Sequence, residues 1–338
     1  SIRARTNGGL IIPGLYSLTN SVNPIQAPIE ILERSAVDGI FANFNLGYKD
    51  TYFLEGSLRR DQSTTLPKDH NVYWYPSIAG SFVFSNLMKD SSWLNHGKLR
   101  INYAEVGADA QALSLYNIYS LNTLFDSKPM ASVSSQLRNS NLKPERTNSF
   151  EVGAEMRFLR DRLGLDVTYY TTESTDQIIP VDVSGATGYA QRWVNAGTLS
   201  NKGIEVSAFV VPIRNDNFSW TLNLNFAKNN SKMTELYGEN TNLQLGSFQG
   251  GITLNATLNE SYGTLRGVDY VYVKGHEGDK DYRVVGDDGY YLQSAPNQVL
   301  GSIIPDWTGG IQNNFKYKDF ALSFLIDIKK GGSLFSLD

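Results

Sequence analysis

Alternation of apolar and polar residues, repeated along one segment after another, most constrains what this chain can fold into. In residues 40–48, 217–227 and 320–328, every second side chain is apolar and the side chains between are mostly small or polar. A two-residue period is the pattern of a β-strand with two unlike faces. We therefore predict an all-β fold with about ten strands, over residues 40–48, 52–58, 73–84, 99–106, 150–158, 163–169, 204–210, 217–227, 307–315 and 320–328.

The composition excludes several classes of protein. The 338 residues contain no cysteine, which rules out a disulfide scaffold, thiolate zinc sites and thiol catalysis. Lys and Arg number 30 against 34 Asp and Glu, so there is no basic surplus for binding nucleic acid. No apolar run reaches the roughly 18 residues of a membrane-spanning helix, but a barrel that spans a membrane with strands remains compatible with the sequence.

The apolar rows are the strongest sign of a membrane environment. A Lys or Arg on a lipid-facing position near the bilayer midplane costs about 2–4 kcal/mol, and the apolar rows carry no charge. Several strands approach the roughly 9–11 residues that cross a bilayer at a tilt, and aromatic residues gather near strand ends. The opposite faces carry Glu55, Arg59, Glu151, Glu155, Arg157, Asp166, Glu205 and Asp327.

Short and long connections alternate between the predicted strands. Short links occur at 49–50, 89–97, 159–162, 212–217 and 316–319, and long ones at 61–72, 108–146, 172–200 and 228–305. A membrane barrel has short periplasmic turns on one rim and long extracellular loops on the other. This order predicts an antiparallel transmembrane β-barrel, whereas a soluble β-sandwich is the alternative that alternation alone leaves open.

Several motifs resemble a known family of outer-membrane proteins. The segment Leu142-Lys143-Pro144-Glu145-Arg146-Thr147, followed by Phe150-Glu151-Val152-Gly153, is similar to a motif of TonB-dependent outer-membrane receptors. A second motif of these receptors is similar to Val194-Asn195-Ala196-Gly197 followed by Asn201-Lys202-Gly203-Ile204-Glu205. The SusC/RagA class of these receptors is indicated by residues 47–52, 58–61, 73–77, 305–310 and 324–328.

The resemblance implies a 22-stranded barrel around a plug, of which ten strands form only a part. We therefore expect residues 1–338 to be a partial barrel, with the plug and the N-terminal segments outside this chain. Two features of the sequence agree. Residues 1–14 lack a signal pattern, and the chain stops just after a strong strand. A complete protein with ragged ends is the alternative.

The function implied by the resemblance is active import of a nutrient oligomer, a glycan or a peptide. The implied partners are TonB, acting through the absent N-terminal part, and a SusD-like surface lipoprotein that forms a lid over the external loops. No cofactor and no covalent chemistry are implied. We expect the loops 108–146, 172–200 and 228–305 to form part of the external mouth and of the contact with the lid.

Two groups of candidate site residues follow. Aromatic rings stack on sugars, so Tyr116, Tyr119, Tyr189 and Trp193 are candidate substrate contacts, with loop packing or lid contact as the alternative. The polar faces supply candidate plug-facing residues in the lumen, with plain solvation of the lumen as the alternative. These lumen residues are Glu151, Glu155, Arg157 and Glu205.

Other functions have weaker support. His70, His96 and His276 are isolated, so a metal site is not expected, although the acidic stretch 275–292 leaves calcium open. We interpret residues 287–289, Asp-Asp-Gly, as a hairpin turn. The alternatives to active import are a passive porin, a soluble adhesin or carbohydrate-binding module, and a glycan-cleaving enzyme, for which no acid/base pair stands out.

Overall fold

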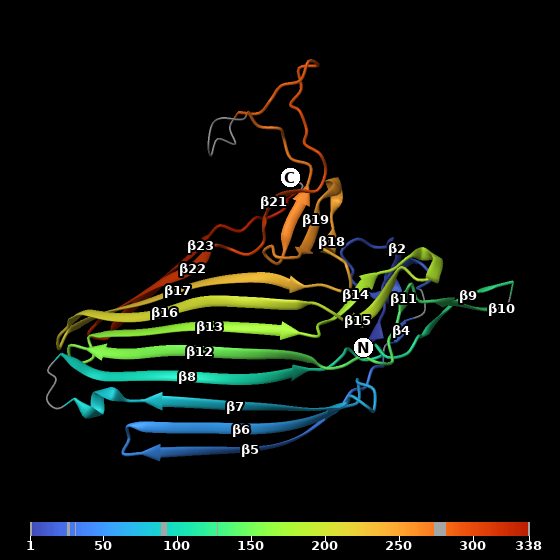
Figure 1. The fold of residues 1–338 in the computed structure, drawn as a ribbon. Coiled ribbons are helices and arrows are strands. Elements are labelled where there is room, and N and C mark those ends of the chain that lie inside the picture. The colour runs from blue at the N-terminus through green and yellow to red at the C-terminus, as the bar shows by residue number, and fades with distance from the viewer. Residues whose placement is uncertain are drawn as a thin grey trace.

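The main body of the protein is one curved antiparallel sheet of ten strands, seen in a computed structural model that describes residues 2–25, 28–30, 32–88, 93–126, 128–273 and 282–336 (Figure 1). Each of the ten strands pairs with its neighbours along the chain, and all these pairs are antiparallel. The ten segments predicted as strands all lie in this sheet. The strands are β5 (Val37–Tyr48), β6 (Tyr52–Ser63), β7 (Val72–Phe82), β8 (Leu94–Ala108), β12 (Glu145–Phe158), β13 (Leu163–Thr175), β16 (Thr198–Arg214), β17 (Phe218–Glu235), β22 (Trp307–Tyr317) and β23 (Phe320–Lys330).

The predicted alternation of connections is also present. Short turns lie at one end of the sheet, and the long connections 64–71, 109–144, 176–197 and 236–306 gather at the other (Figure 1). The sheet ends on β5 and β23, which have no further strand partner within the described residues.

Small sheets and short helices occupy the N-terminal segment and the connections. The paired strands are β1 (Ile2–Arg3) with β4 (Ile29–Glu30), β2 (Asn7–Leu10) with β3 (Ser21–Asn23), β9 (Tyr119–Phe125) with β10 (Lys128–Val133), β11 (Gln136–Leu137) and β14 (Ile178–Asp182) with β15 (Gln191–Asn195), and β18 (Asn242–Ser247), β19 (Thr253–Thr257), β20 (Thr264–Gly267) and β21 (Gln298–Ser302) in one sheet. The 3₁₀ helices are η1 (Leu18–Asn20), η2 (Phe84–Leu87), η3 (Gly185–Thr187) and η4 (Gln249–Gly251). Across the described part of the chain, no helix is long and apolar enough to cross a membrane.

Most strands extend further toward the loops than the alternation predicts. Strand β17 continues to Glu235, and β12 begins at Glu145. In these extensions both faces carry polar residues, so the two-residue period disappears while the backbone pairing continues, as between Arg146 and Thr175. The strands therefore continue toward the long connections past the segment in which their outward face is apolar.

Within the described residues, no second layer covers the apolar rows. Phe44 and Phe324 are 49% and 45% exposed. The accessible surface is 23183 Å², against about 13,800 Å² expected for a compact protein of this mass. These values contradict the soluble sandwich, in which such side chains would fill the space between two sheets.

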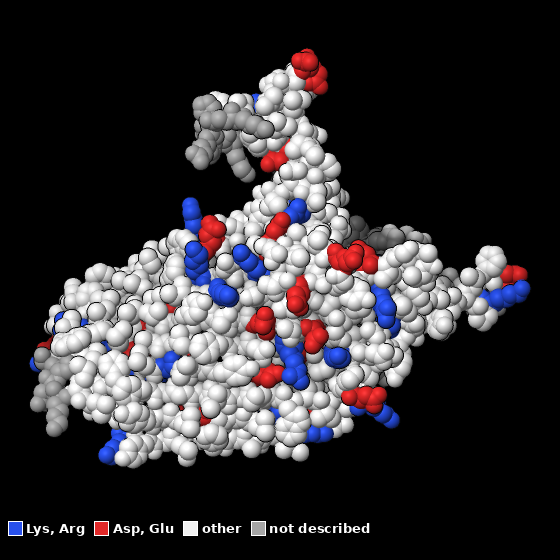
Figure 2. All heavy atoms as spheres, viewed as in Figure 1, with Lys and Arg blue, Asp and Glu red and all other residues white. Residues whose placement is uncertain are grey.

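The exposed apolar side chains form a continuous band across the sheet. The strand register aligns Leu99, Ala154, Val167, Val206 and Phe226 in one row of outward-facing positions. In Figure 2, the strands facing the viewer show few charged atoms toward the short turns, and the charged atoms gather toward the long loops. This distribution matches a surface that contacts hydrocarbon along one part of its height.

Aromatic rings border this band. Near the short turns the stacked pairs are Tyr52–Phe82, Trp93–Phe158 and Trp220–Phe315, with ring centroids 5.1, 5.7 and 5.5 Å apart. Near the loop end, Phe226 and Trp307 lie 5.7 Å apart. Tyr170 of β13 does not belong to this border, because it points inward, where its hydroxyl contacts Asn229 over Gly203.

Two adjacent residues of β17 test the assignment of the faces. Leu224 lies in the apolar band, and Asn225 points to the opposite face. We expect Leu224→Arg to lower the free energy of unfolding in lipid vesicles by about 2–4 kcal/mol, because it puts a cation into hydrocarbon. Asn225→Arg should cost less than about 1 kcal/mol, as at other solvated positions. Urea titrations of the intact protein would measure both, and equal losses would contradict the assignment.

Candidate functional site

The inward face of the sheet carries the charged residues predicted to line a lumen. Glu151, Glu155 and Arg157 alternate along β12 with the outward apolar residues, and Glu205 stands on β16 opposite Thr168 of β13. All four therefore share one face. The register also joins Glu155 to Asp166 on the next strand, which makes the inward face a connected polar surface.

The four charged residues differ in their partners. Glu151 accepts hydrogen bonds from Asn102 at 3.2 Å and Ser149 at 3.4 Å. Glu155 forms an ion pair with Arg157 at 3.0 Å. Glu205 is exposed on the inward face. Glu205 and the half-exposed Arg157 side chain are therefore the most accessible of the four to a neighbouring structure.

A glycine allows one ion pair to span three strands. Arg100 of β8 passes over Gly153 of β12 and donates to both carboxylate oxygens of Asp166 on β13, at 2.9 and 2.5 Å. A Cβ atom at position 153 would lie only 2.6 Å from Nε of Arg100. This crossing gives a physical reason for the glycine in the Phe150-Glu151-Val152-Gly153 motif.

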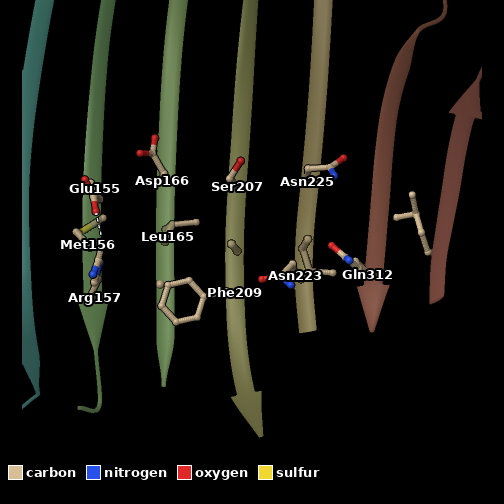
Figure 3. A pocket seen from close by; sticks show the side chains of 14 residues that line it. Glu155, Met156, Arg157, Leu165, Asp166, Ser207, Phe209, Asn223, Asn225 and Gln312 are labelled. Carbon is tan, nitrogen blue, oxygen red and sulfur yellow. Dashed lines mark hydrogen bonds and ion pairs between the residues drawn. The ribbon is translucent and has the colours of Figure 1, made fainter. Parts of the chain in front are cut away.

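A hollow of about 480 Å³ lies against the inward face toward the short turns (Figure 3). Figure 3 shows Asp166, Ser207 and Asn225 side by side on neighbouring strands. Phe209 and Gln312 line the hollow one step closer to the turns. Carboxylates, amides, a hydroxyl and one phenyl ring together suit a polar chain with occasional apolar side chains.

The loop end is held together by a buried apolar cluster of Leu66, Tyr73, Ala110 and Leu142. Leu142, from the sequence motif that precedes β12, is completely buried and packs with residues of three other segments. The sequence identified this leucine as part of a motif but gave no sign of its role as the anchor of the loops.

Two carboxylates, the buried Asp61 and the half-buried Asp109, support the same region. Asp109, just beyond β8, accepts hydrogen bonds from Ser63 and from Thr65, the latter at 2.9 Å. Asp61 accepts from Nε of Arg59 at 2.8 Å and from the Tyr75 hydroxyl. The Asp109 contacts join the connections 64–71 and 109–144 at the end of β6, and the Asp61 contacts join β6 to β7 just below them.

The predicted aromatic contacts fall into two groups. Tyr116 and Tyr119 are 70% and 68% exposed on the long connection between β8 and β12. Tyr189 is half-buried. Trp193 is only 9% exposed, its indole N–H donates to Gln136 at 3.2 Å, and the Arg138 guanidinium lies 5.4 Å from its ring. These contacts match the packing role that the sequence left open for Trp193.

Pairing between β11 and β15 joins two of the loops that the sequence treated separately. Gln136 and Gln191 are register partners, and their side-chain amides form a hydrogen bond at 2.9 Å. The Ala190 N–H also donates to the Ser135 carbonyl at 2.8 Å. The connections 109–144 and 176–197 therefore form one structural unit at the rim.

A hairpin arm projects away from the sheet beyond β20 (Figure 1). The Arg283 guanidinium lies 4.4 Å from the centroid of Tyr270 and 5.4 Å from that of Tyr291. Desolvation by its neighbours, together with the hydrogen bond donated to Asp269, raises the pKa of the Tyr272 hydroxyl. The turn predicted at residues 287–289 is present, with Gly289 at a φ of 82°.

No group of three or more His, Asp, Glu or Cys residues suited to a metal ion occurs within the described ranges. His276 and part of the acidic stretch 275–292 lie outside the described residues. The possible calcium site in residues 275–292 therefore lies partly outside the described residues.

Residues 5–321 match the family described as "TonB dependent receptor-like, beta-barrel". The chain is similar to TonB-dependent receptor P26 of Formosa agariphila, with 28% identity over 322 residues that cover 89% of this chain and 32% of that protein. It is also 28% identical to TonB-dependent receptor SusC of Bacteroides thetaiotaomicron over 221 residues, which cover 61% of this chain and 21% of SusC.

Among solved structures, the fold is similar to the RagAB peptide transporter. The TM-score is 0.76 at 20% identity, over 94% of this chain and 36% of the transporter chain. In the open-open state of the RagAB peptide importer the TM-score is 0.75 at 21% identity, over 94% of this chain and 35% of that chain. This chain thus spans about a third of the length of these relatives.

We expect Gly153→Ala to displace Arg100 and weaken its contact with Asp166. Both partners are about one-third exposed, so the loss should be about 1 kcal/mol in the free energy of unfolding. In an Arg100→Ala background the same glycine substitution should have almost no effect, because the contact is already gone. Urea titrations of the four proteins would measure the coupling, and additive losses would contradict it.

We expect Leu142→Ala to loosen the connection 109–144, since removing a fully buried leucine costs about 2–5 kcal/mol. Hydrogen exchange should rise across that connection and across 64–71. Leu121→Ala is the matched control, because Leu121 is 86% exposed. Similar exchange in the two variants would show that the cluster does not hold the loops.

Proposed function

Because this chain belongs to the TonB-dependent receptor-like β-barrel family and is of the SusC/RagA type, we propose that it forms part of the wall and mouth of an importer of nutrient oligomers. The family consists of outer-membrane transporters, so no covalent chemistry is involved. The observation that carries the proposal is the pair of unlike faces of the ten strands. The apolar side chains outside suit lipid, while charged and amide groups inside line a polar path.

The lengths of the connections indicate which end of the path faces the outside of the cell. The short turns face the periplasm, and the long connections face the outside. A glycan or peptide oligomer would enter between the long connections. A SusD-like lipoprotein would close over them, and the exposed projecting arm with Tyr290 at its tip is a suitable contact.

Energy would come from TonB, acting on a plug in the rest of the protein. We assign Glu151, Glu155, Arg157 and Glu205 to the surface that faces this plug, because all four lie on the inward face. Further strands, from parts of the protein beyond these residues, would complete a barrel of the 22-stranded class. Residues 1–338 would then act as a partial barrel within the whole transporter.

Among the four aromatic residues, Tyr116 and Tyr119 are the better candidates for contact with the nutrient. Their rings are exposed at the mouth, and a sugar or an aromatic side chain can stack on an exposed ring. Tyr189 retains partial access. Trp193 would instead fix the loop that carries Tyr189.

The test of the function is import by cells that produce the intact transporter. Uptake of the natural nutrient should stop when TonB is deleted or the proton gradient is dissipated, because import against a gradient requires energy. A matched strain without the transporter gives the background. Transporter-dependent uptake that persists without energy would support the passive porin instead.

Ligand titrations on the purified transporter test the aromatic assignments. Tyr119→Ala should weaken binding about 5- to 30-fold, as expected if an aromatic contact of roughly 1–2 kcal/mol is lost. Trp193→Phe should bind normally, because the ring still fills its packed site. A normal affinity for Tyr119→Ala would remove Tyr119 from the contact surface.

A further inference from the structure

Three lysines gather on the outward face, at the loop-side edge of the apolar band and just beyond it. Lys202 of β16 stands opposite Asn230 of β17, while Lys228 and Lys232 stand opposite Ile204 and Ser200. The register is continuous over this stretch, so all three lysines share the face of Phe226 and Val206. Their side chains project away from the inward face, where Ser231 and Met233 are buried under the loops.

The spacing forms a compact cationic triangle. Lys202 lies diagonally between Lys228 and Lys232, at about 7–8 Å from each by the usual geometry of antiparallel pairs. Lys228 and Lys232 are four residues apart, or about 13 Å along the strand. The Asn230 amide and the Thr171 hydroxyl lie beside Lys202 on its two neighbouring strands and add polar groups to the same patch.

These lysines lack the carboxylate partners that three inward arginines have. Arg59, Arg100 and Arg157 are all paired with a carboxylate. Over the described part of the chain, no ion pair or side-chain hydrogen bond joins Lys202, Lys228 or Lys232 to another residue, and all three are exposed. Glu173 shares this face but forms no ion pair with them, so the patch keeps a net positive charge.

The position of the three lysines relative to the apolar band indicates which part of the bilayer surrounds them. The rows containing Tyr169, Ile204 and Phe226 mark the loop-side edge of the apolar band. Lys228 lies in the same row as Ile204, and Lys202 and Lys232 lie in the next two outward-facing rows toward the long connections. In an outer-membrane barrel this level lies among the lipid headgroups of the outer leaflet. Phosphates on those headgroups are the anions that unpaired ammonium groups can reach there, while the acyl chains lie against the apolar band below.

We propose that Lys202, Lys228 and Lys232 form a binding site for a phosphorylated glycolipid of the outer leaflet. The triangle holds the phosphates, Asn230 donates a hydrogen bond, and the apolar side chains below contact the acyl chains. This site lies on the outside of the barrel wall, apart from the nutrient path. It depends on the position of the chain in the outer membrane and not on the import activity.

The test uses the intact transporter purified in mild detergent and native mass spectrometry with bis-phosphorylated lipid A as the probe. We expect the wild type to retain a bound lipid A and the triple variant K202Q/K228Q/K232Q to bind it about 100-fold more weakly. Each single variant should lose about 5-fold. Lys128→Gln and Lys143→Gln, which lie on the connection between β8 and β12, form the control and should bind like the wild type.

Two further probes identify the source of the anion. Dephosphorylated lipid A should bind poorly to the wild type, and inorganic phosphate should compete only weakly, because it lacks the acyl chains. Equal retention of lipid A by the wild type and the triple variant would overturn the proposal. Equal binding of phosphorylated and dephosphorylated lipid would do the same, and strong competition by phosphate would show a site for a free anion. Unchanged heat stability of the triple variant would confirm that it folds.

Discussion

Contact between uncharged outward side chains and hydrocarbon is the constraint on which the rest of the structure depends. A sheet that lacks a second layer would not be stable in water, because its apolar side chains would remain exposed, as Phe44 and Phe324 are here. In lipid, the same exposure is favourable, and the backbone groups within the sheet are satisfied by the neighbouring strands. The inward positions are then free to carry carboxylates, amides and hydroxyls. The polar path and the lipid-facing wall are thus two results of one alternating pattern.

Glycine has a particular role on the inward face, because long side chains cross from one strand to another over it. Arg100 lies over Gly153 to reach Asp166, and the Tyr170 ring lies over Gly203. In both places a Cβ atom would collide with the crossing side chain. Each crossing joins two strands that are separated by a third strand and share no backbone pairing. The inner wall gains a fixed arrangement of charge without the dense core that would block a passage.

The strands and their order could be predicted because the bilayer imposes a strict pattern on them. Residues 217–227 alternate throughout, and the pattern stops only where β17 rises above the apolar band. The loop end follows no such period. The burial of Leu142 and the hydrogen bonds to Asp109 depend on contacts between segments far apart in the chain. Trp193 shows the same difficulty, since an aromatic residue in a polar loop is equally compatible with binding a ligand and with packing against Arg138.

The free edges of the sheet have a consequence for assembly. Strands β5 and β23 each leave one row of backbone N–H and C=O groups without a strand partner among the described residues. Each such group left unsatisfied in hydrocarbon costs several kcal/mol, so the edges cannot rest in the bilayer by themselves. If further strands complete the barrel, as proposed above, insertion would be concerted with their docking or shielded until they arrive. Closure of the ring, more than the folding of any one hairpin, would then commit the polypeptide to the membrane.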